Sequence, residues 1–158
     1  MVERTLIILK PDAVQRGLIG RILARFEEKG QKVVGAKFTV LPRALVEKHY
    51  EPHQGKPFYA GLVDYMSKGP VLVVCIEGAF AIEASRKLMG ATFGYKAEPG
   101  TIRGDFTSSK GMNLIHGSDS PEAAAREVAL FFKPEELIRY ELQNSPYLCS
   151  DEDRKAAS

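Results

Sequence analysis

The side chain in this sequence best placed to do chemistry is a histidine at the end of a short apolar segment. His116 follows Asn113-Leu114-Ile115 and precedes Gly117-Ser118-Asp119-Ser120, which is typical of the start of a helix. An imidazole has an ordinary pKa of about 6.5, so at pH 7 it is mostly neutral and offers a nitrogen lone pair. His116 is therefore a candidate nucleophile or general base. The alternative is a strand-end histidine that only satisfies the backbone.

A histidine in either role needs an acceptor on its second ring nitrogen, which fixes the tautomer and stabilises the cation formed on attack. Glu127 is a candidate for that acceptor. It lies three residues after Ala124 and one before Val128, at the border of an apolar helical stripe. A carboxylate there can lean over the edge of the core toward a strand end. The alternative is a solvated glutamate on the helix surface.

A second group of residues could bind an anion. In the segment 99–106, glycines allow the backbone to approach an anion closely, and the guanidinium of Arg103 can grip phosphate oxygens in a fork. Arg86 and Thr92 bracket the entrance to this segment, and Lys10 ends the first expected strand. Each alone is typical of a solvated cation or a turn hydroxyl. Their joint placement at strand ends and in one loop predicts a shared anion site.

Several familiar kinds of site are missing from the sequence. It contains no G-x-x-x-x-G-K-[ST], G-x-G-x-x-G, H-E-x-x-H or C-x-x-C pattern. Its two cysteines, Cys75 and Cys149, cannot build a disulfide framework or a four-ligand zinc site. The 22 basic and 20 acidic residues give a net charge of +2, smaller than the surplus usual in proteins that coat nucleic acid. A bound anion must therefore meet a local cluster of cations.

The hydrophobic pattern predicts four strands with helices between them. The strands are expected over residues 5–9, 33–41, 71–76 and 113–116. Helices are expected over residues 19–29, 43–50, 58–66 and 79–89, and from Pro121 onward. This order predicts an α/β (α+β) sandwich, in which a ferredoxin-like four-stranded antiparallel sheet is covered by helices.

The length of 158 residues predicts one domain over 1–158, in which about 150–158 is a polar tail with little to bury. Residues 90–112 show no sustained hydrophobic period, and such long irregular stretches in compact domains are often functional. Phe58 could stack on a base, although its helical spacing favours a core role. No apolar run approaches about 18 residues, so no membrane span is expected. Without a signal-peptide pattern, the expected location is the cytoplasm.

The octapeptide Asn113-Leu114-Ile115-His116-Gly117-Ser118-Asp119-Ser120 resembles the active-site signature of nucleoside diphosphate kinases. Further segments fall in the order and at the spacing of that family: 5–15, 17–26, 49–50, 56–58, 67–70, 77–78, 86–92 and 99–106. The resemblance covers roughly residues 3 to 140. It implies the same ferredoxin-like sandwich that the order of elements predicts.

The resemblance also implies a reaction. The γ-phosphoryl group of a nucleoside triphosphate, typically ATP, would pass to a nucleoside diphosphate with Mg²⁺, by a ping-pong route through a phosphohistidine. His116 would be the nucleophile, Glu127 would orient its ring through the distal nitrogen, and Ser118 would support that arrangement. Nucleotide-binding roles match the following positions: Lys10, Tyr50, Arg86, Thr92 and Arg103 for the phosphates, Lys10 and Asn113 for the ribose 3′-hydroxyl, and Phe58 for the base. No direct metal ligand is implied, because Mg²⁺ would be held mainly through the phosphates.

The resemblance further implies a homo-oligomer, with a hexamer expected ahead of a tetramer. One departure from the family pattern follows Thr92, where Phe93-Gly94-Tyr95-Lys96 replaces the common Asn-Pro and alters the expected loop shape. The chain beyond Tyr140 is also longer than in compact members. No specific nucleic-acid or membrane partner is expected.

Two other classes of function remain open from the residues themselves. One is a ferredoxin-like binding module that senses nucleotides or holds single-stranded nucleic acid, although aromatics do not alternate along any expected strand. The other is a hydrolase in which Ser118 or Ser120 attacks and His116 acts as the base. Neither serine lies in a G-x-S-x-G pattern, which disfavours the hydrolase.

Overall fold

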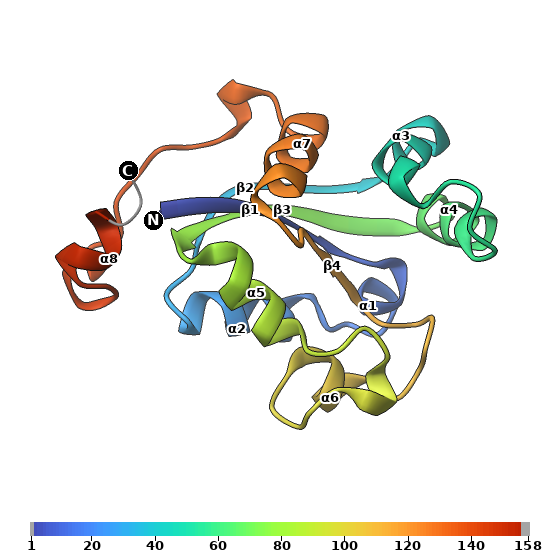
Figure 1. The fold of residues 1–158 in the computed structure, drawn as a ribbon, viewed down its shortest axis with the longest axis horizontal. Helices are drawn as coiled ribbons and strands as arrows, with labels where there is room; N and C mark the ends of the chain where they lie inside the picture. The colour runs from blue at the N-terminus through green and yellow to red at the C-terminus, as the bar shows by residue number, and fades with distance from the viewer. Residues whose placement is uncertain (1, 156–158) are drawn as a thin grey trace.

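A four-stranded antiparallel sheet lies at the centre of the computed structural model, which describes residues 2–155 (Figure 1). The strands are β1 (Val2–Leu9), β2 (Lys32–Val40), β3 (Pro70–Ala79) and β4 (Ile115–Gly117), in the order β2-β3-β1-β4. All three neighbouring pairs run antiparallel. This order and these directions are those of a ferredoxin-like sheet, so the predicted fold class is confirmed.

Strand β1 explains why the sheet needs helices on both faces. Its four residues from Leu6 to Leu9 are fully buried, yet successive side chains of a strand point to opposite faces. Leu6 and Ile8 therefore belong to one hydrophobic cluster, and Ile7 and Leu9 belong to another. Each cluster is closed by its own layer of helices.

The helices divide between the two faces accordingly (Figure 1). Those that pack on the Leu6 face are α3 (Arg43–His49), α4 (Tyr59–Ser67) and α7 (Pro121–Phe131). Those that pack on the Ile7 face are α1 (Pro11–Gln15), α2 (Ile19–Glu28), α5 (Ala81–Met89) and α6 (Ile102–Phe106). Strand β4, which carries His116, is an edge strand of the sheet. Side chains from α5, α6 and α7 contact this strand.

The remaining helical pieces are short. They are the 3₁₀ turns Glu51–His53, Gly94–Lys96, Pro134–Glu136 and Ser145–Tyr147, and the helix α8 (Asp151–Lys155). Beyond α7 the chain runs beside β2, where the amide of Ile138 donates to the carbonyl of Val34 at 2.8 Å. Among residues 2–155, none of the helices combines the length and apolar composition needed to cross a membrane.

The short elements are where the sequence pattern was misleading. The stretch 90–112 contains a 3₁₀ turn and helix α6, and helix α1 begins directly after Lys10, where no helix was expected. A five-residue helix such as α6 makes little more than one turn, so it shows no repeating hydrophobic period. In the expected polar tail, α8 forms from residue 151, while residues 156–158 lie outside the described part.

Candidate active site

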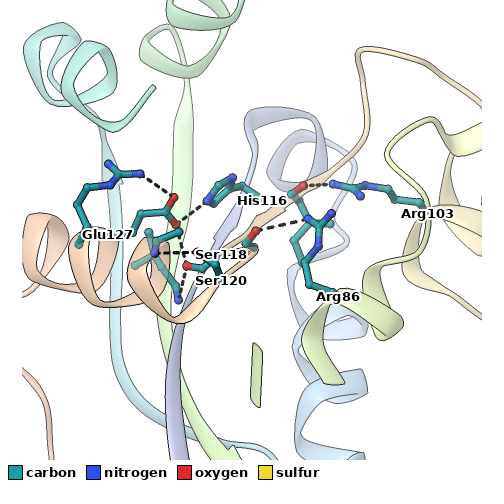
Figure 2. Close-up of polar contacts among 11 residues, drawn as sticks. Arg86, Arg103, His116, Ser118, Ser120 and Glu127 are labelled. Atoms are coloured by element: carbon teal, nitrogen blue, oxygen red, sulfur yellow. Dashed lines mark hydrogen bonds and ion pairs between the residues drawn. The ribbon is translucent and has the colours of Figure 1, made fainter. Parts of the chain in front are cut away.

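His116, Glu127 and Ser118 form one hydrogen-bonded group. Strand β4 places His116 opposite Ile8 of β1. Its Nε2 lies 2.9 Å from Glu127 Oε2, and the Ser118 hydroxyl donates to the same oxygen at 2.7 Å (Figure 2). Ser118 Oγ in turn accepts the amide of Leu6 at 3.2 Å, which ties the group to the central strand. The structure therefore brings together the three residues that the sequence assigned to one site.

Helix α7 positions Glu127. The helix begins after Ser120, whose side chain caps it by accepting the amide of Ala123 at 3.1 Å, and Pro121 occupies its first turn. Its buried face is formed by Ala124, Glu127, Val128 and Phe131, the spacing of one helical stripe. Glu127 is thus a carboxylate on the core-facing side of the helix and is only 4% exposed, so the solvated alternative is wrong.

The electrostatics of Glu127 decide the tautomer of the histidine. Burial raises the pKa of the carboxyl, but the hydrogen bonds from His116 and Ser118 and the nearby imidazoles outweigh burial, and the pKa falls below its ordinary value. An ionised carboxylate only accepts hydrogen bonds, so His116 Nε2 carries the proton and donates it. The lone pair of the histidine is therefore on Nδ1.

Three cations converge without acidic partners. Lys10 and Arg103 are buried, Arg86 is exposed, and no ion pair found between residues 2 and 155 includes any of the three. Burial and the like charge of Arg103 lower the pKa of Lys10 to about 8. Burial and the like charge of Arg86 lower the pKa of Arg103 to about 10. Cations that repel one another in this way mark a place where an external anion is stabilised.

Arg103 also connects several elements of the site by hydrogen bonds. Thr101 caps α6 by accepting the amide of Gly104 at 3.0 Å, which starts the helix just before Arg103. The guanidinium then donates to the carbonyls of Gly90, Asn113 and Ile115 at 3.0, 3.1 and 2.6 Å. These bonds link α6 to Gly90, where the segment between α5 and β4 begins, and to Asn113 and Ile115, where it ends. A guanidinium has five N–H donors, so two remain for a ligand.

A chain of side-chain contacts joins Lys10 to Thr92. Lys10 Nζ donates to Asn113 Oδ1 at 2.8 Å, and Asn113 Nδ2 donates to the carbonyl of Thr92 at 2.9 Å. The next residue, Leu114, has a φ of 71°, a left-handed conformation that is strained for leucine. Its amide donates to Asp12 Oδ2 at 3.0 Å, so the carboxylate at the start of α1 holds the strained turn before His116.

A row of rings leads from His116 to the surface. Tyr50 lies 6.1 Å from His116 between ring centroids, His53 lies 6.3 Å from Tyr50, and Phe58 lies 5.6 Å from His53. Phe58 is 53% exposed, so the core role favoured by its spacing is wrong. The Tyr50 hydroxyl is buried without a hydrogen-bond partner in the described chain, and burial raises its pKa above the ordinary value. It remains a protonated donor near His116.

Two residues of the site were missed from the sequence. His49 lies 4.5 Å from His116 between ring centroids, in an edge-to-face arrangement, and Asp12 holds Leu114. The only signal for His49 was its position beside Tyr50 in a matched segment. For Asp12 the only signal was likewise its place in the matched segment 5–15, because its contact joins residues 102 positions apart.

The ligand atoms available in the site can be compared with those that Mg²⁺ prefers. Mg²⁺ prefers six oxygen ligands and usually keeps water and phosphate oxygens among them. Within residues 2–155, the cluster with converging metal-ligand atoms consists of His49, His116 and Glu127. Two imidazoles and one carboxylate do not make a magnesium cage. This donor set would not hold Mg²⁺ by itself, so the magnesium implied by the resemblance would need oxygen ligands from a bound phosphate.

Comparisons with known proteins show which family this chain and its fold resemble. The family model for "Nucleoside diphosphate kinase" matches residues 3–137. A nucleoside diphosphate kinase of Pyrococcus furiosus is 56% identical over 142 residues, covering 88% of both chains. The Halobacterium salinarum nucleoside diphosphate kinase in complex with CDP superimposes with a TM-score of 0.92 at 47% identity, covering 95% of this chain and 100% of that one.

A third relative was solved as a transition-state mimic with vanadate and ADP. It is the nucleoside diphosphate kinase of Borrelia burgdorferi, with a TM-score of 0.88 at 38% identity, covering 94% of this chain and 98% of that one. A ferredoxin-like sandwich with an anion site of this kind defines a class of phosphotransferases. The chain belongs to the nucleoside diphosphate kinase family. Its reaction is the transfer of the γ-phosphoryl group from a nucleoside triphosphate to a nucleoside diphosphate.

Proposed function

We propose that this chain carries the phosphoryl group on Nδ1 of His116 between two half-reactions. The observation that carries the proposal is the 2.9 Å contact of Nε2 with the ionised carboxylate of Glu127, which leaves the Nδ1 lone pair free. In the first half-reaction, Nδ1 forms a bond to the γ-phosphorus while the bond to the β,γ-bridging oxygen breaks, and the nucleoside diphosphate leaves. In the second, a different nucleoside diphosphate takes the phosphoryl group back.

Glu127 stabilises the charge that His116 acquires. When Nδ1 bonds to phosphorus, the imidazole becomes cationic, and Glu127 already faces its Nε2–H. Because Glu127 is buried and fixed by Ser118, it needs no rearrangement during the reaction. Ser118 is therefore a positioning residue, and the attacking-serine alternative is disfavoured because its hydroxyl proton is donated to Glu127.

The cations hold the phosphates. Phosphoryl transfer needs in-line placement and charge neutralisation more than covalent help. Lys10, Arg86 and Arg103 supply three positive charges without acidic partners, and the Tyr50 hydroxyl supplies a free donor next to His116. Thr92 is exposed beside them and adds a hydroxyl. We assign these five residues to the phosphates of the bound nucleotide.

Three further side chains are assigned to the ribose and the base. Lys10 and Asn113, 2.8 Å apart, are assigned to the ribose 3′-hydroxyl. Phe58 is assigned to the base, because its exposed ring offers a stacking face. Stacking carries no hydrogen-bond code, so the site should accept different bases. The CDP and ADP complexes of the relatives support nucleoside diphosphates of both pyrimidine and purine type as substrates. Mg²⁺ supplies further charge neutralisation when it is bound with the nucleotide.

We also propose a homo-oligomer, with a hexamer ahead of a tetramer. The edge strand β2 exposes Phe38 by 62% and Val40 by 55%, and an exposed apolar edge is a surface that proteins normally cover. The cytoplasmic location expected from the sequence stays a prediction.

The test is phosphohistidine formation with ATP labelled on its γ-phosphate. The parent protein should acquire acid-labile label that any added nucleoside diphosphate discharges. His116→Gln should abolish both labelling and exchange while the circular dichroism spectrum stays unchanged. His53→Gln is the matched control, because it removes a nearby imidazole that lies outside the Glu127 group, and it should still be labelled.

Two outcomes would contradict the proposal. Substantial exchange by His116→Gln would show that another residue carries the phosphoryl group. Release of inorganic phosphate by the parent without transfer to an acceptor would indicate a hydrolase. If the parent bound nucleotide but acquired no label, the binding-module alternative would hold.

A further inference from the structure

His49 is a buried polar side chain that the proposed mechanism does not use. It is 3% exposed, and neither ring nitrogen has a hydrogen-bond partner in the described chain. Leaving a buried polar group unpaired is destabilising, so such groups in native proteins call for an explanation. A neutral imidazole keeps one nitrogen lone pair, and in His49 no group of the described chain bonds to it.

The surroundings of His49 direct that lone pair toward the active site. On its other sides the ring packs edge-on against Tyr50 and Phe131, at 4.4 and 5.2 Å between centroids. Toward the active site it faces His116. One ligand atom each from His49, His116 and Glu127 lie within 4.8 Å of one another. Two imidazoles and one carboxylate therefore converge from α3, β4 and α7.

This donor set matches one class of metal. Zn²⁺ is bound by imidazole nitrogen and carboxylate oxygen at about 2.0–2.2 Å, and tetrahedral ligands then lie about 3.3 Å apart. Rotations of the side chains that move the atoms by about 1 Å would close the cluster to that spacing. The set of two His and one Glu with a fourth position left to solvent is a known zinc arrangement. Mg²⁺, in contrast, selects oxygen ligands.

We propose that His49, His116 and Glu127 form a binding site for Zn²⁺ or a similar divalent transition metal, which blocks the phosphorylation of His116. The second part rests on the phosphohistidine function proposed above. The metal would take His116 Nε2, the nitrogen that now faces Glu127. The proton on Nε2 then moves to Nδ1, since a neutral imidazole carries one N–H. The lone pair that attacks the γ-phosphorus is thereby lost.

Access and charge set the conditions for binding. The His116 side chain is 20% exposed, so a metal ion can enter from its solvent side, where water or a phosphate oxygen completes the coordination. Arg126, 3.4 Å from Glu127 Oε1, and the cation Lys10 repel a dication. A bound phosphate that compensates these charges should therefore strengthen metal binding. Inorganic phosphate serves as the probe for this effect.

The first experiment measures metal binding without any activity. Zn²⁺ is titrated calorimetrically into nucleotide-free protein carrying Cys149→Ser. This change removes the partly exposed thiol of Cys149, which lies outside the cluster and could also bind zinc. One site per chain is expected. His49→Gln and, separately, Glu127→Gln should each weaken Zn²⁺ binding at least about tenfold, as loss of a ligand does. His53→Gln is the control and should bind as the parent does.

Co²⁺ provides a second readout of the same site. Four-coordinate Co²⁺ absorbs visible light much more strongly than the hydrated ion, so the parent should show that band and His49→Gln should not. The proposal is overturned if the parent binds no Zn²⁺, or if His49→Gln and Glu127→Gln both bind it as tightly as the parent. Because two different variants remove ligands, failure of one to fold leaves the test intact.

The second experiment measures labelling of His116 by γ-labelled ATP at constant Mg²⁺, with and without Zn²⁺. Zinc at about ten times its measured Kd should slow labelling of the parent about tenfold, and each variant is compared with its own zinc-free rate. His49→Gln should be insensitive to zinc, and His53→Gln should be as sensitive as the parent. Equal inhibition of His49→Gln and the parent would overturn the blocking role. Absence of label in zinc-free buffer would instead contradict the phosphohistidine function, while the binding result would stand.

Discussion

Lys10 shows how one side chain can be costly to the free protein and necessary for binding. It is 7% exposed, and its pKa is lowered to about 8 by burial and by Arg103. The folded pKa lies below the unfolded value of 10.5, so ionised Lys10 lowers the free energy of unfolding fully below pH 8. That penalty fades as pH rises and is gone above 10.5. A bound phosphate offsets this penalty, because it stabilises the ammonium form of Lys10.

We therefore predict that binding a nucleoside diphosphate near pH 8.5 takes up a proton at Lys10. Calorimetry in buffers of different ionisation enthalpy measures this uptake directly. Lys10→Met should abolish it and weaken binding about 10- to 100-fold, the range for loss of a charged hydrogen bond. Lys87→Met is the control, because Lys87 lies on the exposed side of α5 in an ion pair with Glu83. Undiminished uptake by Lys10→Met would show that another group takes the proton.

At the scale of the element, α7 links the stability of the protein to its chemistry. The cap at Ser120 fixes where the helix begins, and Glu127 lies two turns further along its buried face. Strand β4 and α7 are joined by only three residues, Ser118, Asp119 and Ser120. A shift in the start of the helix therefore moves Glu127 relative to His116.

We predict that Ser120→Ala lowers the free energy of unfolding by about 0.5–2 kcal/mol, the usual cost of losing an N-cap. It should also slow the labelling of His116, because fraying of the first turn loosens Glu127. Urea unfolding and the labelling rate are the two measurements. Ser108→Ala, at an exposed position outside any helix, should change stability by less than about 0.5 kcal/mol. Equal effects of the two variants would mean that the cap has no special role.

At the scale of the whole molecule, β2 is the exposed edge of the sheet. The C-terminal segment covers its first half, where Ile138 and Tyr140 bond to the carbonyls of Val34 and Val33. The second half is left open. Phe38 and Val40 pair with Leu72 and Pro70 of β3, so they share one face of the sheet and expose apolar surface there.

We predict that Phe38→Glu breaks the oligomer into smaller species, because a carboxylate buried in a subunit contact would lack a partner. Sedimentation velocity measures the change. Tyr147→Glu is the matched control, since Tyr147 is 90% exposed on the 3₁₀ turn Ser145–Tyr147, and it should leave the assembly unchanged. A parent that sediments as a monomer would contradict the predicted oligomer.

The order of strands and helices could be read from the sequence because each long element carries its own hydrophobic period. The run from Leu6 to Leu9, the stripe of α7 and the strand β3 are such local signals. They were sufficient for the sandwich, and the motif around His116 was sufficient for the family. Helices α1 and α6 were missed because about one turn of helix carries no period.

The residue types of the site, and the chemistry they could support, were determined by the sequence: an imidazole at a strand end, a glutamate on an apolar stripe and cations at strand ends and around one loop. Only the tertiary structure decided how they act together. It showed that Glu127 faces Nε2 of His116, that Arg103 binds three backbone carbonyls, and that His49 is buried beside His116. The physical reason is that hydrogen bonding and desolvation act between neighbours in space, and these neighbours come from separate elements of the chain. The near-zero net charge similarly averages over a molecule whose cations without acidic partners gather around β4.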